Sequence, residues 1–388
     1  MKKKLSLLLA IMMLFTMIAF AGCSTTEEEV PGGETPGIQT PGDETPGDET
    51  PGDETPGTGK EPEEEVKNLA DPVQVVIDNH FTRGFNVKGQ QDGIGTVFGK
   101  LTYDDPTVKP AWSLGQWYCG YFHSPVEKPK RNEDYAPEFN ILNAETNEHG
   151  ATKTENNGLW VFKDASKTLR VNPSTGMVYA KLEGTKEYTS ARKDNEPWPH
   201  LLLEYGMESG IKLDELDSLT LNLDYTLKAF SGDMGASLKS DIHCAQFPFY
   251  CVVSNRNTES KDYGRYIWFG ACLFDNRQDF TMTFASADIG SDEKLATGAF
   301  IYQVGQRAYL DAPVAKGELI EIKWNMLPFM KTAFETAQRN GYLKNTKFED
   351  LYATGGNMGW EVTGTYDAAL QIDKFEIMAV KDLDKAAK

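Results

Sequence analysis

The chain has 388 residues, of which 25% are charged, and its formal net charge is −19. Residues 24–66 contain 14 Asp or Glu and a single Lys, so residues 67–388 carry a net charge of about −9. This acidic balance argues against a nucleic-acid partner and against a basic membrane-binding patch, and a neutral ligand such as a polysaccharide fits it better.

The first residues predict an export signal. Lys2, Lys3 and Lys4 precede an apolar run from Leu5 to Ala19, which is shorter than a typical membrane-spanning helix. The segment Phe20-Ala21-Gly22-Cys23 resembles a bacterial lipobox, although Phe20 replaces the usual Leu. We therefore expect a signal peptide over residues 1–22 and a lipidated Cys23 that anchors the chain to the extracellular face of the membrane. An ordinary signal peptide with an incidental cysteine is the alternative.

Residues 23–66 are expected to be a disordered acidic linker. Five-residue repeats of the type PGDET run from Pro31 to Thr55 and contain almost no apolar side chain. Pro and Gly oppose regular structure, and like charges extend the segment, so it would act as a spacer.

Residues 67–388 are long enough for one large, mostly β domain. Leu219 to Leu227 alternates strictly between apolar and polar residues, as in a half-buried strand. Further strands are predicted at 159–162, 176–182, 200–205, 250–254, 266–274, 280–284, 300–304, 319–324 and 368–380. One helix is predicted over Phe329–Asn340, where apolar residues follow helical spacing. The expected fold is a two-sheet β-sandwich or concanavalin A-like jelly roll with this helix packed on it. Residues 67–190 would either complete its sheets or form an insertion over a cleft.

Four cysteines follow Cys23: Cys119, Cys244, Cys251 and Cys272. An even count in an exported domain permits two disulfides, with Cys244–Cys251 the closest pair, and four buried thiols are the alternative. The five histidines are scattered, and neither a nucleophile elbow nor a phosphate loop is present, so we expect no metal and no cofactor.

Aromatic side chains near polar groups suggest carbohydrate binding, because flat rings stack on the apolar faces of sugars. Burial in a core is the alternative for each ring. The rings expected to contact a ligand are Trp112, Trp117, Tyr266, Trp268 and Trp360.

Glu361 lies on a predicted strand between Trp360 and Val362. If those two residues point into the core, the carboxylate of Glu361 lies on the opposite face, with Gly359 and Thr363 beside it. A solvated Glu on an outer face is the alternative.

From about Pro197 onward the order of segments resembles glycoside hydrolase family 12, the jelly-roll endo-β-glucanases. The segments that carry this likeness are 198–203, 216–227, 263–269, 329–340 and 359–364. The resemblance covers roughly the last 190 residues and implies that Glu361 is the acid/base residue and Asp224 an active-site aspartate. It also implies that Gly264 replaces the nucleophilic glutamate. Retaining hydrolysis needs two carboxyl groups about 5–5.5 Å apart, so this replacement puts catalysis in doubt.

Three functions follow from these observations. The first is a surface lipoprotein that binds a neutral, β-glucan-like polysaccharide as a non-catalytic relative of glycoside hydrolases. The second is an active endo-acting glycoside hydrolase with Glu361 as acid/base, and the third is a structural or adhesive surface protein. An enzyme needs a second carboxylate facing Glu361, a binding protein needs aromatic rings along the site, and a structural protein would fill it with its own loops.

Overall fold

The computed structural model describes residues 67–91, 95–232, 234–288 and 297–387. The expected signal peptide, Cys23 and the PGDET linker lie outside these residues. Every element described here belongs to one compact unit that contains residues 68–388. Within the described ranges, no helix has the length and apolar character needed to cross a bilayer.

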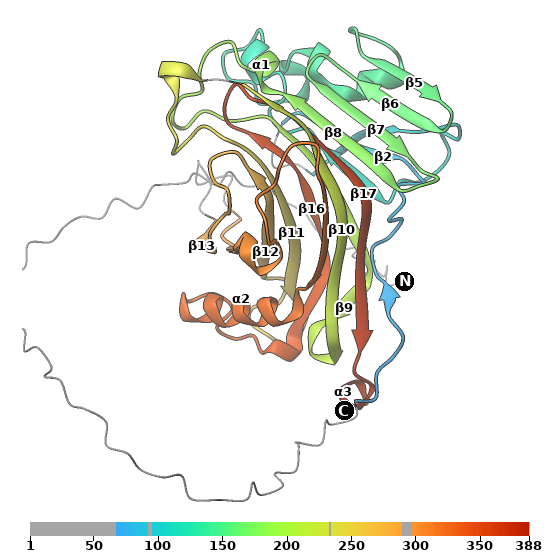
Figure 1. Ribbon diagram of the computed structural model, residues 1–388, viewed down its shortest axis with the longest axis vertical. Helices are drawn as coiled ribbons and strands as arrows, with labels where there is room; N and C mark the ends of the chain where they lie inside the picture. Colours follow the sequence, from blue (N-terminus) through green and yellow to red (C-terminus); the bar gives the residue numbers. More distant parts are fainter. Residues whose placement is uncertain (1–66, 92–94, 233, 289–296, 388) are drawn as a thin grey trace, which may run out of the picture. The chain divides into compact units, whose positions relative to one another are not determined.

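Two large β-sheets face each other across one core (Figure 1). The eight-stranded sheet has the order β15-β10-β17-β8-β7-β6-β5, with β1 paired to β17. Its strands are β1 (Val73–Gln74), β5 (Thr152–Asn156), β6 (Leu159–Lys163), β7 (Lys167–Asn172), β8 (Met177–Glu183), β10 (Leu216–Ser231), β15 (Leu319–Asn325) and β17 (Asp367–Lys381).

The nine-stranded sheet has the order β13-β14-β12-β11-β16-β9-β4-β2-β3. Its strands are β2 (Phe85–Lys88), β3 (Val97–Leu101), β4 (Trp112–Gly115), β9 (His200–Lys212), β11 (Ala245–Asn255), β12 (Tyr266–Asp275), β13 (Phe284–Ala287), β14 (Phe300–Val304) and β16 (Leu351–Val362). Most neighbouring strands are antiparallel, whereas β12–β14 and β2–β4 are parallel pairs.

The core lies between the sheets and follows the two-residue period of each strand. Leu219, Leu221, Leu223 and Tyr225 of β10 are fully buried there, and they face alternate residues of the other sheet. On β16 the inward positions are Met358, Trp360 and Val362; on β11 they are Phe247, Phe249 and Cys251. The residues between these inward positions therefore point to the outer face of the nine-stranded sheet, the face turned away from the other sheet.

Helix α2 (Leu327–Arg339) closes one edge of the sandwich, where it contacts β10 of one sheet and β12 and β14 of the other. Its buried stripe is Met330, Ala333, Phe334 and Ala337, at the spacing expected of an amphipathic helix. The remaining α-helices are short: α1 (Gly184–Glu187) and α3 (Leu383–Ala386). Short 3-10 helices occupy 121–123, 132–134, 137–139, 141–145, 213–215, 235–237, 306–308 and 348–350.

The predicted mostly β sandwich with one packed helix is confirmed, and most predicted strands are present with longer bounds. The strand predicted at 280–284 is wrong except at its last residue, because β13 begins at Phe284. Gly264, which the resemblance sets at the nucleophile position, lies before β12 begins and adopts a φ of 79°, a left-handed turn conformation that glycine favours. Residues 67–190 contribute strands to both sheets, so they complete the sandwich.

Cys119, Cys244, Cys251 and Cys272 are all buried free thiols. The predicted alternative of two disulfides is therefore wrong. Burial raises the pKa of each thiol, that of Cys251 to about 12, so all four behave as small apolar side chains rather than as nucleophiles.

Candidate functional site

The outer face of the nine-stranded sheet carries an unusual group of buried polar side chains. We name this group the polar strip; its members, all buried, are Lys88, His200, Glu204, Gln246, Asn357 and Glu361. They come from β2, β9, β11 and β16, and their neighbours along each strand point into the core. Buried polar groups are costly without partners, so this group is the first place to look for a ligand site.

Glu361 lies at one end of the polar strip, between two strand neighbours. Its Cα partners are His200 on β9 and Gln246 on β11. Its Oε2 atom accepts hydrogen bonds from Gln246 Nε2 at 3.2 Å and from Trp198 Nε1 at 3.4 Å. Burial raises the pKa of Glu361 to about 7, and the two hydrogen bonds oppose that rise. The carboxyl is thus poised to hold a proton near neutral pH.

His200 stands beside Glu361 as a neutral imidazole. Its Nε2 is 3.8 Å from Glu361 Oε2, and its ring stacks on Trp198 with centroids 5.5 Å apart. Burial lowers the pKa of His200 to about 3, so the ring carries no charge at ordinary pH. Its Nδ1 is buried and has no hydrogen-bond partner among the described residues.

Asn357 and Glu204 form the other end of the polar strip. They are directly opposite each other on β16 and β9, and four residues along the strands separate them from Glu361 and His200. At a rise of about 3.3 Å per residue in a strand, this separation is about 13 Å. Asn357 is fully buried, yet both its Oδ1 and its Nδ2 lack a hydrogen-bond partner among the described residues.

Glu204 forms a buried ion pair with Lys88. Lys88 Nζ donates to Glu204 Oε2, while Glu204 Oε1 has no partner within the described part of the chain. Burial raises the pKa of Glu204, and the Lys88 ammonium opposes that rise. The carboxylate leans toward Gly115, where a Cβ atom would lie 3.3 Å from Oε1. Glycine at this position leaves room for the carboxylate over the sheet.

Two hydrophobic clusters lie on the same face as the polar strip. The Trp198 cluster contains Trp117, Tyr118, Tyr135, Tyr188, Trp198 and Leu202, with Tyr121 and Phe122 packed against it. The Trp268 cluster contains Tyr250, Val252, Trp268, Ala299 and Ile301, with Tyr266 and Phe284 packed against it. Tyr266 and Trp268 meet edge to face at 5.3 Å, and Tyr266 is only half-buried.

The structure separates the predicted ligand-binding rings into two groups. Trp117, Tyr266 and Trp268 belong to the outer face, but Trp117 and Trp268 are buried within their clusters, and Tyr266 alone of the three is half-buried. Trp112 and Trp360 are fully buried between the sheets, where their Nε1 atoms donate to the carbonyls of Asp78 and Ala180. They are core residues, so the prediction that they contact a ligand is corrected.

Asp224 does not lie near Glu361. It is on β10 in the eight-stranded sheet, and its neighbours Leu223 and Tyr225 point into the core, so its side chain points to the far side of that sheet. Its Cα partners are Glu321 and Lys374, both on outer-facing positions. The prediction that Asp224 lies in the site with Glu361 is thereby corrected. Glu204 shares the outer face with Glu361, and so does Asp275, the Cα partner of Gln246.

Sequence reasoning missed Lys88, Glu204, Gln246 and Asn357. The sequence did contain a signal for Glu204. It is the one acidic residue in the apolar run Leu201–Tyr205, and strand alternation puts it on the same face as His200. Lys88 lies near Glu204 only because β2 pairs with β4, and β4 pairs with β9. No local sequence pattern predicts this long-range pairing. Among the described residues, no group of His, Cys, Asp or Glu is arranged to hold a metal ion.

Comparisons with known proteins find no matching protein-family profile and no matching curated protein. Solved structures similar to this chain include endoglucanase cel12A from Rhodothermus marinus, which is 9% identical with a TM-score of 0.32. The matched region covers 57% of this chain and 92% of that one. A family 12 xyloglucanase from Bacillus licheniformis is 9% identical with a TM-score of 0.34, over 59% of this chain and 96% of that one.

A family 11 xylanase from Neocallimastix patriciarum is also similar, at 10% identity and a TM-score of 0.28, over 59% of this chain and 95% of that one. At scores near 0.3 these likenesses do not by themselves define function. A metagenome-derived glycoside hydrolase family 12 endoglucanase is similar as well, at 10% identity and a TM-score of 0.33, over 57% of this chain and 90% of that one.

Proposed function

We propose that the polar strip binds a neutral polysaccharide, and that the chain is a surface lipoprotein tethered through Cys23. The observation that carries the proposal is the pair Asn357 and Glu204, which face each other and hold three buried polar atoms without partners among the described residues. Such atoms cost free energy unless a ligand or water satisfies them. Sugar hydroxyls both donate and accept, so they match an amide beside a carboxylate.

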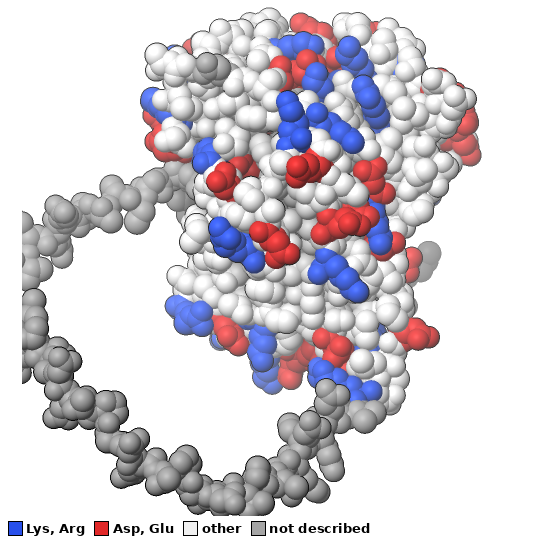
Figure 2. All heavy atoms as spheres, in the orientation of Figure 1, with Lys and Arg blue, Asp and Glu red and all other residues white. Residues whose placement is uncertain are grey.

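The charge of the polar strip favours a neutral ligand. Lys88 compensates Glu204, His200 is uncharged, and the pKa of Glu361 is raised to about 7. No net charge of either sign is left to attract a charged polymer. On the face of the molecule seen in Figure 2, Lys and Arg are interleaved with Asp and Glu.

The Trp268 cluster supplies the apolar part of sugar recognition. Tyr266 and Phe284 are its least buried rings, on β12 and β13. Aromatic faces at the border of a polar site suit the apolar faces of pyranose rings. A polysaccharide lying across the strands would contact these rings directly, whereas the buried polar strip would have to be uncovered for contact.

A second candidate function is endo-acting hydrolysis of β-linked glucans, and the raised pKa of Glu361 favours it. A carboxyl that holds its proton near pH 7 is suited to protonate a leaving glycosidic oxygen. In that case Glu204, not Asp224, would be the second carboxylate. Glu204 and Glu361 are about 13 Å apart along the strands, whereas the two carboxyl groups of a retaining enzyme are about 5–5.5 Å apart. Hydrolysis by this pair would therefore follow the inverting mechanism, in which the carboxyl groups are about 6.5–9.5 Å apart. Both side chains would have to lean toward each other to reach that distance.

The test compares binding and cleavage by the full chain on soluble β-glucan, xyloglucan and xylan. Affinity electrophoresis measures binding, and reducing-end release measures cleavage. Polysaccharide binding that Asn357→Ala weakens, with no reducing ends released, supports the proposed function. Release that both Glu361→Gln and Glu204→Gln abolish would instead establish the hydrolase. Failure to bind or cleave any of the three polymers would leave the structural or adhesive role.

A further inference from the structure

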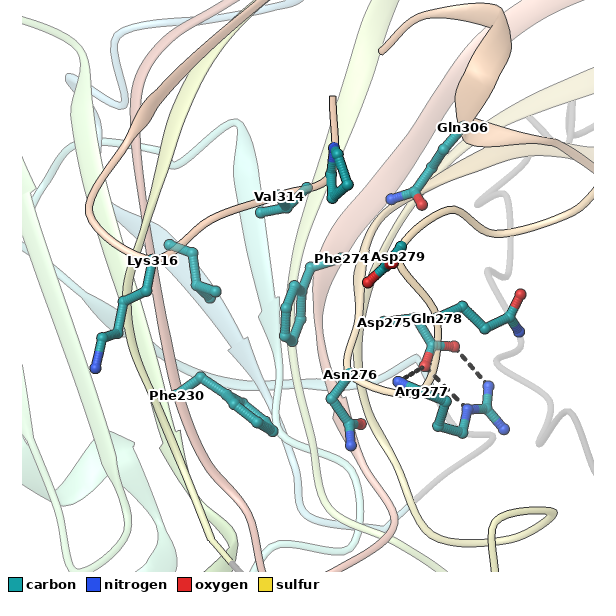
Figure 3. A pocket seen from close by; sticks show the side chains of 12 residues that line it. Phe230, Phe274, Asp275, Asn276, Arg277, Gln278, Asp279, Gln306, Val314 and Lys316 are labelled. Atoms are coloured by element: carbon teal, nitrogen blue, oxygen red, sulfur yellow. Dashed lines mark hydrogen bonds and ion pairs between the residues drawn. The ribbon is translucent and has the colours of Figure 1, made fainter. Parts of the chain in front are cut away.

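A pocket of about 420 Å³ opens at one end of the sandwich, beside the Glu361 end of the polar strip. It is lined by Leu227 and Phe230 of β10, by Phe274 of β12, and by residues of the loops that follow β12 and β14. Its walls therefore come from both sheets, and Figure 3 shows their side chains converging on one space. The volume lies in the range of small-molecule sites.

One wall of the pocket is aromatic. Phe230 and Phe274 meet edge to face with centroids 5.4 Å apart, and Phe230 also stacks on Tyr366. Phe274 is almost fully buried, whereas Phe230 is half-buried. A rigid ring with part of its face open to a pocket is a platform for an apolar ligand face.

The facing wall is polar and held in place. Asp275 accepts two hydrogen bonds from Arg277, from Nε at 2.9 Å and from Nη2 at 2.6 Å, which fixes the guanidinium at the pocket edge. Gln306 is 1% exposed, and its Oε1 accepts from the Thr281 backbone at 2.7 Å. Figure 3 shows the amide nitrogen of Gln306 on the side of the pocket.

The charged residues of the pocket cancel. Asp275 is paired with Arg277, and Asp279 and Lys316 carry opposite charges. A phosphate or polyanion would find no excess of positive charge here. An aromatic platform, amide groups and no net charge together describe a site for an uncharged, hydroxyl-rich ligand.

We infer that this pocket is a second carbohydrate site, which takes a terminal or side-branch sugar of the same polysaccharide. The choice of ligand class rests on the proposed function, whereas the pocket itself does not. The two sites are neighbours, because Asp275 is the Cα partner of Gln246, whose amide donates to Glu361. A branched chain on the polar strip could therefore also engage the pocket.

The test is isothermal titration of the full chain with cellohexaose and with a xyloglucan heptasaccharide. Val314→Trp would fill the pocket from a half-buried loop position, and Lys316→Ala would trim its exposed rim without touching the core. Val73→Trp, on an exposed position of β1, is the matched control for a new surface tryptophan. Thermal melts check that each variant folds.

The expected result is two binding sites, of which Val314→Trp weakens one at least tenfold and Asn357→Ala weakens the other. If only one site is found, and Asn357→Ala removes it while Val314→Trp leaves it intact, the pocket is not a carbohydrate site and the proposed function stands. A single site lost only in Val314→Trp would keep the pocket and overturn the proposed function. If neither sugar binds the wild-type chain, both fall.

Discussion

Asn357 on β16 and Glu204 on β9 lie directly opposite each other, and each keeps polar atoms buried without a partner among the described residues. Both point to the outer face of the nine-stranded sheet, where Lys88 neutralises one of them. A well-packed core would avoid such groups, because each costs about 1–3 kcal/mol when it is left unsatisfied. The proposed ligand would supply the hydrogen-bond partners that the described residues do not.

Asn357→Ala should weaken polysaccharide binding at least tenfold, because it removes a buried donor and acceptor worth about 1.4 kcal/mol or more to a bound sugar. The variant should keep its stability, since no protein hydrogen bond is lost in the described structure. Affinity electrophoresis and urea unfolding measure the two effects. Asn222→Ala, on the outward side of the other sheet, is the matched control and should bind normally. Equal binding by Asn357→Ala and wild type would contradict the prediction.

Lys88→Met should destabilise the protein by roughly 3–5 kcal/mol, because it leaves the buried Glu204 carboxylate without its counter-charge. The double variant Lys88→Met/Glu204→Gln should regain much of this loss, since the uncompensated charge is gone. Chemical unfolding of all four proteins completes a double-mutant cycle. Independent, additive effects would show that the two side chains do not form the neutral pair described here.

Glu361→Gln should change how stability depends on pH. The pKa of Glu361 is about 7 in the folded protein and near 4.5 when unfolded, so between these values the folded chain retains a proton that the unfolded chain has released. Wild-type stability should therefore fall as pH rises from about 4.5 to 7, by on the order of 3 kcal/mol, and then level off.

Gln does not titrate, so the free energy of unfolding of Glu361→Gln should rise relative to that of the wild type across this pH window. The difference should persist at pH 8. Urea unfolding at pH 4, 6 and 8 measures it. Glu321→Gln, at an exposed position on β15, is the control and should show no such trend. If the stability difference between the variant and the wild type is the same at all three pH values, folding does not raise the pKa of Glu361, and the prediction is wrong.

Reducing agent should leave the melting temperature unchanged, because Cys119, Cys244, Cys251 and Cys272 are buried thiols. Iodoacetamide should label none of the four in the folded protein and all four after denaturation. Peptide mapping by mass spectrometry identifies the labelled positions. Any of these cysteines that resists alkylation in denaturant without reductant, and reacts after reduction, would reveal a disulfide.

The sequence predicted the elements whose pattern is local. The alternation from Leu219 to Leu227 and the stripe on Phe329–Asn340 correspond to β10 and α2, and the flanks of Glu361 placed it on the outer face. The family resemblance placed Asp224 in the active site. Alternation could not correct this, because it shows which face of its own strand a residue occupies but not which sheet the strand joins. Lys88 and Glu204 are 116 residues apart, and only long-range strand pairing brings them together.

The aromatic residues show the same limit. Trp112 and Trp117 are five residues apart in one aromatic segment, yet one packs between the sheets and the other on the outer face. Composition marks both as candidates for sugar binding, and only the position of β4 (Trp112–Gly115) relative to its neighbours separates them. Which aromatic residues lie on the outer face therefore depends on how the strands are arranged in the sheet, and the aromatic composition of a segment does not predict it.

The most direct test of the account is a crystal structure of the full chain bound to cellohexaose or to a xyloglucan heptasaccharide. The account predicts a sugar chain across the outer face of β9, β11 and β16, with hydroxyl groups within hydrogen-bond distance of Asn357 and Glu204. An ordered oligosaccharide that leaves both of these side chains without a polar contact would contradict it.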